Sequence, residues 1–244
     1  MQPLAAPILA AALALAAPPA ALADERQPAG WKALLIAGDD AEAAFDNAVE
    51  TMAAKLESFG VPRDHIIALK AQGDEEVSSR ENIQAGFESL AAEPDEGCFF
   101  YATSHGLRGQ GLVMRRAQAV LSPRALGHLL DRFCGGRPTV VIASGCFSGI
   151  FAEGPLVPAA NRAILTAARG DRPSFGCNAH LEYTVFDHCV LDSLERGIAW
   201  KTVMDRTRAC VSGNEWDMRV NDPSEPQLFI GEDVAGLRVF APNP

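Results

Sequence analysis

The chain has 244 residues, of which 48% are hydrophobic and 21% are charged, and its formal net charge is -10 at pH 7. These values are typical of a globular protein that is long enough to bury its own core, and they exclude a disordered or collagen-like chain. The negative charge disfavours a nucleic-acid backbone or an anionic membrane surface, so we expect neither as a partner.

The first 23 residues differ from the rest of the chain. They carry no charged side chain, residues 4–17 are almost entirely Ala and Leu, and an Ala-x-Ala motif stands at 21–23. A short apolar run that ends in this motif is typical of a cleaved secretory signal, and it falls short of the about 20 apolar residues that span a membrane. We therefore expect residues 1–23 to be removed on export to the periplasm or the medium. Residues 24–244 are expected to form one domain, monomeric and without a further membrane span.

Beyond residue 30, short apolar runs alternate with amphipathic segments, which is typical of a parallel sheet covered by helices. Strands are predicted over 32–37, 65–69, 98–103, 139–143, 162–167 and 227–230. Helices are predicted over 42–59, 80–92, 123–133, 183–196 and 202–211. We also expect a small hairpin over 109–120 and a polar, Gly- and Pro-rich tail after residue 230.

The first of these helices shows the helical period most clearly. Its apolar side chains recur at spacings of three and four, which places them on one stripe, and Gly60 ends the helix. The stripe consists of Phe45, Val49, Met52, Ala53 and Leu56.

Small and reactive residues follow two consecutive predicted strands. The strand over 98–103 runs into Ser104, His105 and Gly106, and the strand over 139–143 runs into Ser144, Gly145 and Cys146. Neighbouring strands lie about 4.8 Å apart, and ligands of parallel sheets bind beyond the carboxyl ends of the strands. If the two strands are neighbours, the histidine and the cysteine emerge side by side at that edge.

A cysteine beside a histidine suits nucleophilic catalysis on a carbonyl group. The thiolate of Cys146 would attack, and the imidazole of His105 would act as the base and then protonate the leaving amine. The backbone N–H groups of Gly106 and Cys146 would stabilise the oxyanion. A buried histidine and a buried cysteine that only pack in the core remain the alternative.

The two segments that carry this pair resemble the legumain (asparaginyl endopeptidase) family of caspase-fold cysteine peptidases. They read Phe-Phe-Tyr-Ala-Thr-Ser-His-Gly at 99–106 and Val-Val-Ile-Ala-Ser-Gly-Cys-Phe-Ser-Gly at 140–149. Shorter stretches at 35–40, 45–48 and 165–169 are similar to the same family, and Ser-Phe-Gly-Cys at 174–177 is similar to its bacterial members.

The resemblance implies a fold, an activity and a set of site residues. The fold is a caspase-like three-layer α/β/α sandwich with a mostly parallel sheet of about six strands. The activity is that of a thiol endopeptidase acting on peptides or proteins through a thioester acyl-enzyme, with transpeptidation as a variant. His105 and Cys146 would be the catalytic residues, and Gly106 would line the oxyanion hole. With 244 residues, we expect no control by the C-terminal inhibitory domain of animal and plant legumains.

Phe147, Ser104 and the region of Phe45 and Asp46 depart from the legumain pattern. Asp187 could match the acidic residue of the family's pocket, but the alignment there is loose by a residue or two. Phe147 stands where legumains have an acidic residue of the asparagine pocket, and Ser104 stands where they have Asp. The region of Phe45 and Asp46 replaces an expected Arg, so a preference for asparagine is not implied. Candidate pocket residues are Asp39, Asp40, Ser144 and Asp187, of which the first two equally suit a plain turn.

The six cysteines are informative because an exported protein can form disulfides. Cys98 and Cys134 fall at the amino edge of the sheet, and Cys189 and Cys210 fall on successive helices. Each pair suits a disulfide, and buried free thiols would look the same in sequence. Cys177 would then stay free with Cys146. No cysteine or histidine spacing is typical of zinc, so we expect no metal and no cofactor.

Two other functions fit parts of the sequence. The first is an α/β-hydrolase whose nucleophile elbow is Ser144-x-Cys146-x-Ser148, which needs a later histidine, either His180 or His188. The second is a caspase-like binding module without catalysis. Outside the first alternative, the histidines other than His105 are expected to be surface or packing residues.

Overall fold

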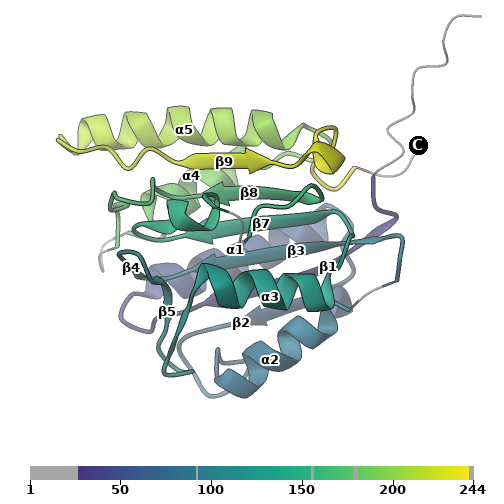
Figure 1. Ribbon diagram of the computed structural model, residues 1–244. Helices are drawn as coiled ribbons and strands as arrows, with labels where there is room; N and C mark the ends of the chain where they lie inside the picture. The colour runs from purple at the N-terminus through teal and green to yellow at the C-terminus, as the bar shows by residue number, and fades with distance from the viewer. Residues whose placement is uncertain (1–26, 92, 155–156, 178–180, 242–244) are drawn as a thin grey trace, which may run out of the picture.

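The structure is a computed structural model that describes residues 27–91, 93–154, 157–177 and 181–241 (Figure 1). Its strands are β1 (Gly30–Ala37), β2 (Ile66–Leu69), β3 (Glu96–Thr103), β4 (Gly106–Leu107), β5 (Gly111–Met114), β6 (Ala119–Leu121), β7 (Thr139–Ser144), β8 (Arg162–Thr166) and β9 (Gln227–Ile230). Its helices are α1 (Ala43–Ser58), α2 (Arg80–Ser89), α3 (Pro123–Phe133), α4 (Val185–Ser193) and α5 (Trp200–Asp217), with short 3-10 helices η1 (Arg63–His65), η2 (Ser148–Phe151) and η3 (Glu232–Val234). The segment 1–23, interpreted as a signal, lies outside the described residues.

A six-stranded sheet forms the middle layer, in the order β2-β1-β3-β7-β8-β9. All neighbouring strands pair in parallel except β8 and β9, which are antiparallel. This confirms the predicted mostly parallel sheet of about six strands. β3 and β7 are direct neighbours, so the two chain segments that carry His105 and Cys146 leave the same edge together.

Helices cover both faces of the sheet and give the molecule three layers. Figure 1 shows α2 and α3 in front of the sheet and α1 behind it. One hydrophobic cluster joins the sheet to α1, α4 and α5, and a second joins the opposite face to α2 and α3. The central strands β1, β3, β7 and β8 are buried on both faces, which is why their sequences read as nearly continuous apolar runs.

The helices begin and end where local side-chain chemistry favours it. The predicted stripe of α1 is buried along its whole length, and Gly60 follows the helix with a φ of +98°. Ser79, Ser122 and Thr184 are the N-caps of α2, α3 and α4, and each accepts a hydrogen bond from a backbone N–H of the first turn. Such caps satisfy donors that a helix start leaves free.

The expected hairpin over 109–120 is part of a larger feature. The structure has a three-stranded antiparallel sheet, β4-β5-β6, that begins at Gly106, directly after His105. It is fastened to the main sheet by Val113, whose N–H donates to the His105 carbonyl (2.9 Å) and whose carbonyl accepts from the Ser104 hydroxyl (2.7 Å). The small sheet therefore holds the backbone of His105 in place.

Two expectations about the C-terminal third were wrong. α5 extends over 18 residues instead of the ten of 202–211, because its polar last turns pack through the buried Glu215, which accepts the Ser224 N–H (3.0 Å). The segment after Ile230 is not a peripheral tail. Its few apolar side chains enter the core, and Phe240 lies with its ring centroid 5.0 Å from that of Trp31.

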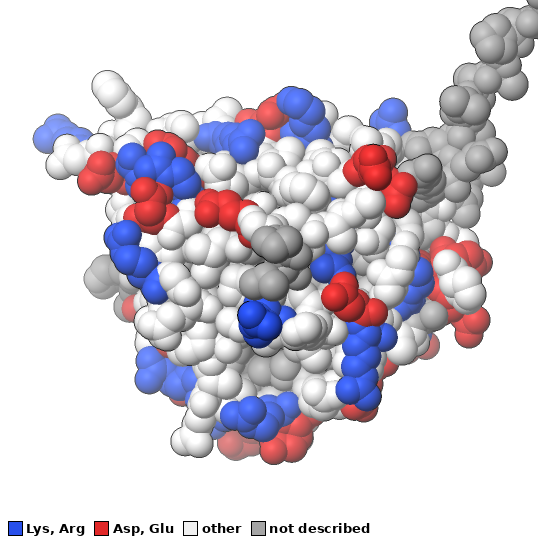
Figure 2. Space-filling view, in the orientation of Figure 1, with Lys and Arg blue, Asp and Glu red and all other residues white. Residues whose placement is uncertain are grey.

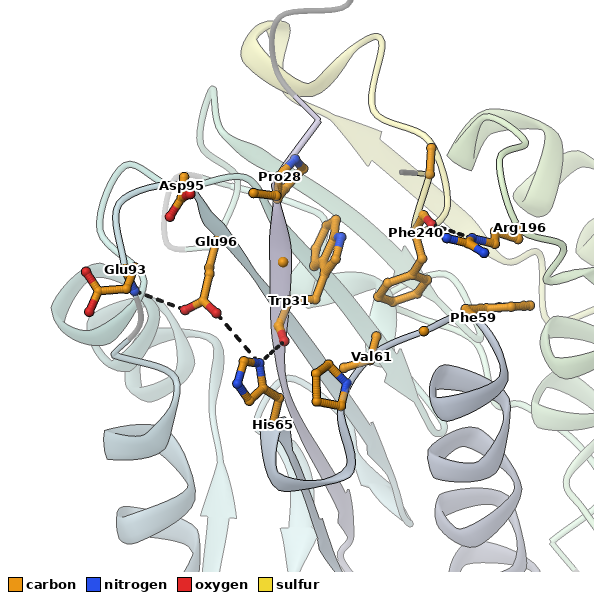
Figure 3. A pocket seen from close by; sticks show the side chains of 15 residues that line it. Pro28, Trp31, Phe59, Val61, His65, Glu93, Asp95, Glu96, Arg196 and Phe240 are labelled. Carbon is orange, nitrogen blue, oxygen red and sulfur yellow. Dashed lines mark hydrogen bonds and ion pairs between the residues drawn. The ribbon is translucent and has the colours of Figure 1, made fainter. Parts of the chain in front are cut away.

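The packed segment lies at the edge of the sheet where β1 and β3 begin. Figure 3 shows Phe240 beside Trp31 and Phe59, around a cavity of about 490 Å³. His65 lines the same cavity and its Nδ1 lies 3.2 Å from the Trp31 carbonyl, as suits a packing residue. Because His105 and Cys146 follow the carboxyl ends of β3 and β7, this cavity is at the other edge from them.

Both cysteine pairs suggested by the sequence are disulfides in the structure. Cys98–Cys134 joins the start of β3 to the end of α3, with a Cα–Cα distance of 6.1 Å. Cys189–Cys210 joins α4 to α5, with a Cα–Cα distance of 5.6 Å. The remaining two cysteines are free.

The described surface carries both signs of charge. Figure 2 shows basic and acidic side chains interspersed over the face in view, although acidic residues outnumber basic ones in the sequence by 31 to 21. In the described part of the chain, no helix combines the length and apolar character needed to cross a bilayer.

Candidate active site

His105 is held from both its backbone and its ring. It follows β3, and its carbonyl accepts the Val113 N–H described above. Its imidazole meets the ring of Phe45 edge to face, with centroids 5.3 Å apart and planes at 86°. Phe45 is fully buried at the start of α1, so it provides a rigid wall for the imidazole. The side chain of His105 remains half-buried at the edge of the sheet.

Cys146 sits on a sharp turn between β7 and η2. Phe147, the next residue, has the left-handed conformation (φ 60°, ψ 16°), which is uncommon for a bulky side chain. Its N–H donates to the Arg172 carbonyl (2.8 Å), and the buried Ser148 hydroxyl accepts the Ala167 N–H (3.0 Å). These bonds hold the turn, so the half-buried thiol of Cys146 is presented from a fixed backbone.

The structure brings the predicted dyad residues together. β3 and β7 pair with Thr103 opposite Ser144, so His105 and Cys146 each stand two residues beyond a paired position. A Cβ placed on Gly106 would lie 1.8 Å from the carbonyl oxygen of Cys146. Only glycine allows this approach of the two backbones.

The sulfur of Cys146 is also in contact with Ser174. The Ser174 N–H points at Sγ from 3.3 Å, its hydroxyl lies 3.9 Å away, and its carbonyl oxygen is 3.5 Å from Sγ. The Ser174 N–H donates to the sulfur, and the Ser174 carbonyl accepts from the thiol S–H. Ser174 was part of the sequence resemblance but was not predicted as a site residue, because its contact joins segments 28 residues apart.

The two free thiols differ in their surroundings. Burial first, and then the negative charges of Cys146, Asp187 and Glu42, together raise the pKa of Cys177 to about 12. At neutral pH, Cys177 is therefore protonated and a poor nucleophile. Of the two free cysteines, Cys177 is thus the one that is poorly suited to act as a nucleophile.

Asp187 and Ser144, two of the candidate pocket residues, lie below the site surface. Asp187 is fully buried and accepts hydrogen bonds from the hydroxyls of Tyr101 (2.7 Å), Thr103 (2.6 Å) and Thr184 (2.8 Å), and from Ser144. Burial raises the pKa of the Asp187 carboxyl, and these hydroxyls oppose the shift. The network ties α4 to the ends of β3 and β7, where it supports the residues above it.

The sequence left a pocket role and a turn role open for Asp39. Its contacts are those of a turn residue. Its carboxylate is 1% exposed, accepts the Ala41 N–H (2.9 Å) and receives two hydrogen bonds from Arg115 (2.7 and 3.0 Å). Burial tends to raise the pKa of Asp39, but these bonds and the charges of Arg115 and His105 outweigh it, so the pKa lies below its ordinary value. Asp40 is exposed and also contacts Arg115 (3.0 Å).

Phe45 and Asp46 lie in the region where legumains have an Arg, and they make other contacts. Phe45 packs on His105, while the buried Asp46 carboxylate accepts the N–H groups of Ala71 (2.6 Å) and Gln72 (3.0 Å). Phe45 thus positions the imidazole of His105, and Asp46 holds the backbone that follows β2. In the described residues, no three His, Cys, Asp or Glu side chains group as a metal site requires.

The α/β-hydrolase alternative needs a later histidine, His180 or His188, at the site. His188 lies on α4 with half of its side chain exposed, and its Nε2 lies 3.5 Å from Asp192. His180 lies outside the described residues.

Comparisons with known proteins agree with this geometry. The model of the Peptidase C13 family matches residues 77–200, about half of the chain, and this range includes both His105 and Cys146. No curated protein matches the sequence significantly. Among solved structures, the crystal structure of caspase-1 from Spodoptera frugiperda is similar over 91% of this chain and 94% of the caspase, with a TM-score of 0.62. Only 12% of the residues are identical, so this likeness shows the fold alone and excludes the α/β-hydrolase alternative. The chain belongs to the peptidase C13 family, and it is a legumain-like cysteine endopeptidase with the caspase fold.

Proposed function

We propose that Cys146 and His105 are the catalytic dyad of this peptidase. The Cys146 thiolate attacks the carbonyl carbon of the scissile peptide bond, and the N–H groups of Gly106 and Cys146 stabilise the oxyanion. His105 takes the proton of the Cys146 thiol as the thiolate forms and gives this proton to the leaving amine, and a thioester to Cys146 remains. Water then releases the acyl group. The observation that carries the proposal is the close approach of Gly106 to the Cys146 backbone at the ends of neighbouring strands.

The test compares wild-type protein with Cys146→Ala and His105→Ala. Each is incubated with a complex peptide mixture, and new termini are identified by mass spectrometry. We expect new termini with the wild type alone, and their sequences would define the specificity. Cleavage that survives in His105→Ala would refute the dyad.

Transpeptidation is a variant of the same mechanism. The acyl-enzyme on Cys146 transfers its acyl group to an amine in place of water, which needs no further residue. Adding a peptide with a free amino terminus to the cleavage reaction tests this directly. Ligated products that contain the added peptide are expected, and hydrolysis alone would exclude the transfer.

We also propose that the protein acts after export, in the periplasm or the medium. The apolar segment 1–23 with its Ala-x-Ala motif supports this, and so do the two disulfides, which form in oxidising compartments. Amino-terminal sequencing of the protein recovered from cell fractions is expected to find a chain that begins at Asp24 outside the cytoplasm.

A further inference from the structure

Within the described part of the chain, one arginine beside the nucleophile has no acidic partner. Arg108 lies in the turn between β4 and β5, and its guanidinium carbon is 4.5 Å from the centroid of the Phe147 ring. Phe147 is the residue after Cys146, and its backbone has the left-handed conformation described above. The side chain of Arg108 is exposed, and it forms no ion pair with any carboxylate of the described residues.

Three other arginines of the surrounding loops form ion pairs, and a fourth, Arg116 in the turn after β5, donates to the carbonyls of Ala71 (2.9 Å) and Gly73 (2.9 Å). Arg115 pairs with Asp39 (2.7 Å), Arg169 pairs with Asp171 (2.5 Å) and Glu225 (2.7 Å), and Arg172 lies 3.4 Å from Asp222. In a chain with net charge -10, an arginine that is left unpaired next to the nucleophile keeps its attraction for anions. Stacking on an aromatic ring leaves the edge of a guanidinium free to bind a carboxylate.

The position of Arg108 in the chain indicates which half of a substrate it meets. His105 must reach the leaving amine, so the leaving-group half of the substrate lies against His105 and the strands that continue from it. Arg108 follows His105 by three residues, through Gly106, whose backbone touches that of Cys146. Arg108 is thus close in the chain to the histidine that meets the leaving amine.

We propose that Arg108, held on the Phe147 ring, is a specificity-determining residue that binds a carboxylate on the leaving-group side of the substrate. The inference rests on the proposed function, because it assigns a substrate class to the same site. The carboxylate is either the side chain of an Asp or Glu just after the scissile bond or the carboxyl terminus of a short leaving group. Binding is an ion pair and involves no covalent step.

Matched peptides test the proposal. One pair is amidated and differs only by Asp or Asn after the scissile bond, and a second pair carries Asn there and ends at that residue as a free acid or an amide. We expect the wild type to cleave at least one carboxylate form with a kcat/KM about fivefold above that of its neutral partner. The pair that shows the preference identifies the source of the carboxylate.

The variant Arg108→Gln is expected to lose this preference, with a ratio near one between the carboxylate and neutral peptides of each pair. Arg124→Gln removes an exposed arginine of α3 and is the matched control, which should keep the preference. A wild-type ratio near one for both pairs, or an unchanged ratio in Arg108→Gln, would overturn the inference and leave the proposed function intact. Failure of every wild-type preparation to cleave peptides would instead refute the proposed function and this inference with it.

Alkylation of Cys146 provides a readout that does not depend on peptide cleavage. Iodoacetate is an anion and iodoacetamide is neutral, so the ratio of their rates at Cys146 reports the local positive charge. We expect this ratio to fall about fivefold in Arg108→Gln and to stay unchanged in Arg124→Gln, with Cys146 followed by mass spectrometry. An unchanged ratio in Arg108→Gln would contradict an anion-attracting role for Arg108.

Discussion

At the scale of single residues, the site depends on a glycine that nothing larger can replace. We expect Gly106→Ala to lower the cleavage rate by at least about 100-fold, because its Cβ would lie 1.8 Å from the Cys146 carbonyl oxygen and would displace an oxyanion donor. The rate on a cleaved peptide measures the effect. Gly136→Ala is the control, since its Cβ would meet no atom within 4 Å, and an active Gly106→Ala would argue against this oxyanion hole.

The two free thiols are expected to react differently with iodoacetamide. The pKa of Cys177 is raised to about 12 by its burial, so at pH 7.5 it stays protonated while Cys146 reacts. Labelling of Cys177 should rise only as the pH approaches that value. Mass spectrometry of the labelled peptides distinguishes the two sites, and equal labelling rates at neutral pH would contradict the assignment.

At the scale of elements, one ion pair joins the end of β1 to the small sheet. The pKa of Asp39 is lowered in the folded state, so its contribution to stability is present above its unfolded pKa of about 3.9 and is lost as the pH falls through the folded value. We therefore expect Arg115→Gln to have a lower Tm than the wild type at pH 7. The difference should shrink below pH 4, as thermal unfolding across that range would show. A difference that is independent of pH would exclude this pair as its source.

The disulfides join elements that the sheet alone would hold more weakly. Cys98–Cys134 closes a loop with a sequence separation of 36, and loops of this size stabilise a fold by about 3 to 4 kcal/mol through the unfolded chain. We expect the double variant Cys98→Ala, Cys134→Ala to lose about this free energy of unfolding, measured with urea. In the presence of a reductant, the difference from the wild type should largely disappear.

At the scale of the whole molecule, the C-terminal segment closes one edge of the core. Phe240 is 3% exposed and its ring meets those of Trp31, Phe59 and Phe99, so Phe240→Ala is expected to cost about 3 to 5 kcal/mol of unfolding free energy. Urea unfolding measures this cost. Trp216→Ala, at a side chain that is 82% exposed, is the aromatic control and should stay within about 0.5 kcal/mol of the wild type.

Much of the architecture was accessible from the sequence because it depends on local patterns. Buried strands of a parallel sheet are apolar on both faces, so β3 and β7 stood out as continuous runs, and helical periodicity marked α1. Boundaries were less accurate where tertiary contacts extend an element, as Glu215 does for α5. The rules of chain connection allowed β3 and β7 to be neighbours, and the structure shows that they pair.

The sequence by itself determined the order of strands and helices, the positions of His105 and Cys146 after two consecutive strands, and the family resemblance. Only the tertiary structure decided how the surroundings of the site are arranged. It shows the contact of Ser174 with the sulfur of Cys146, the packing of Arg108 on the Phe147 ring and the ion pair of Asp39 with Arg115. The physical reason is that periodicity and capping act between residues close in the chain. Contacts between loops depend on where the folded sheet brings distant segments together, and no local pattern records them.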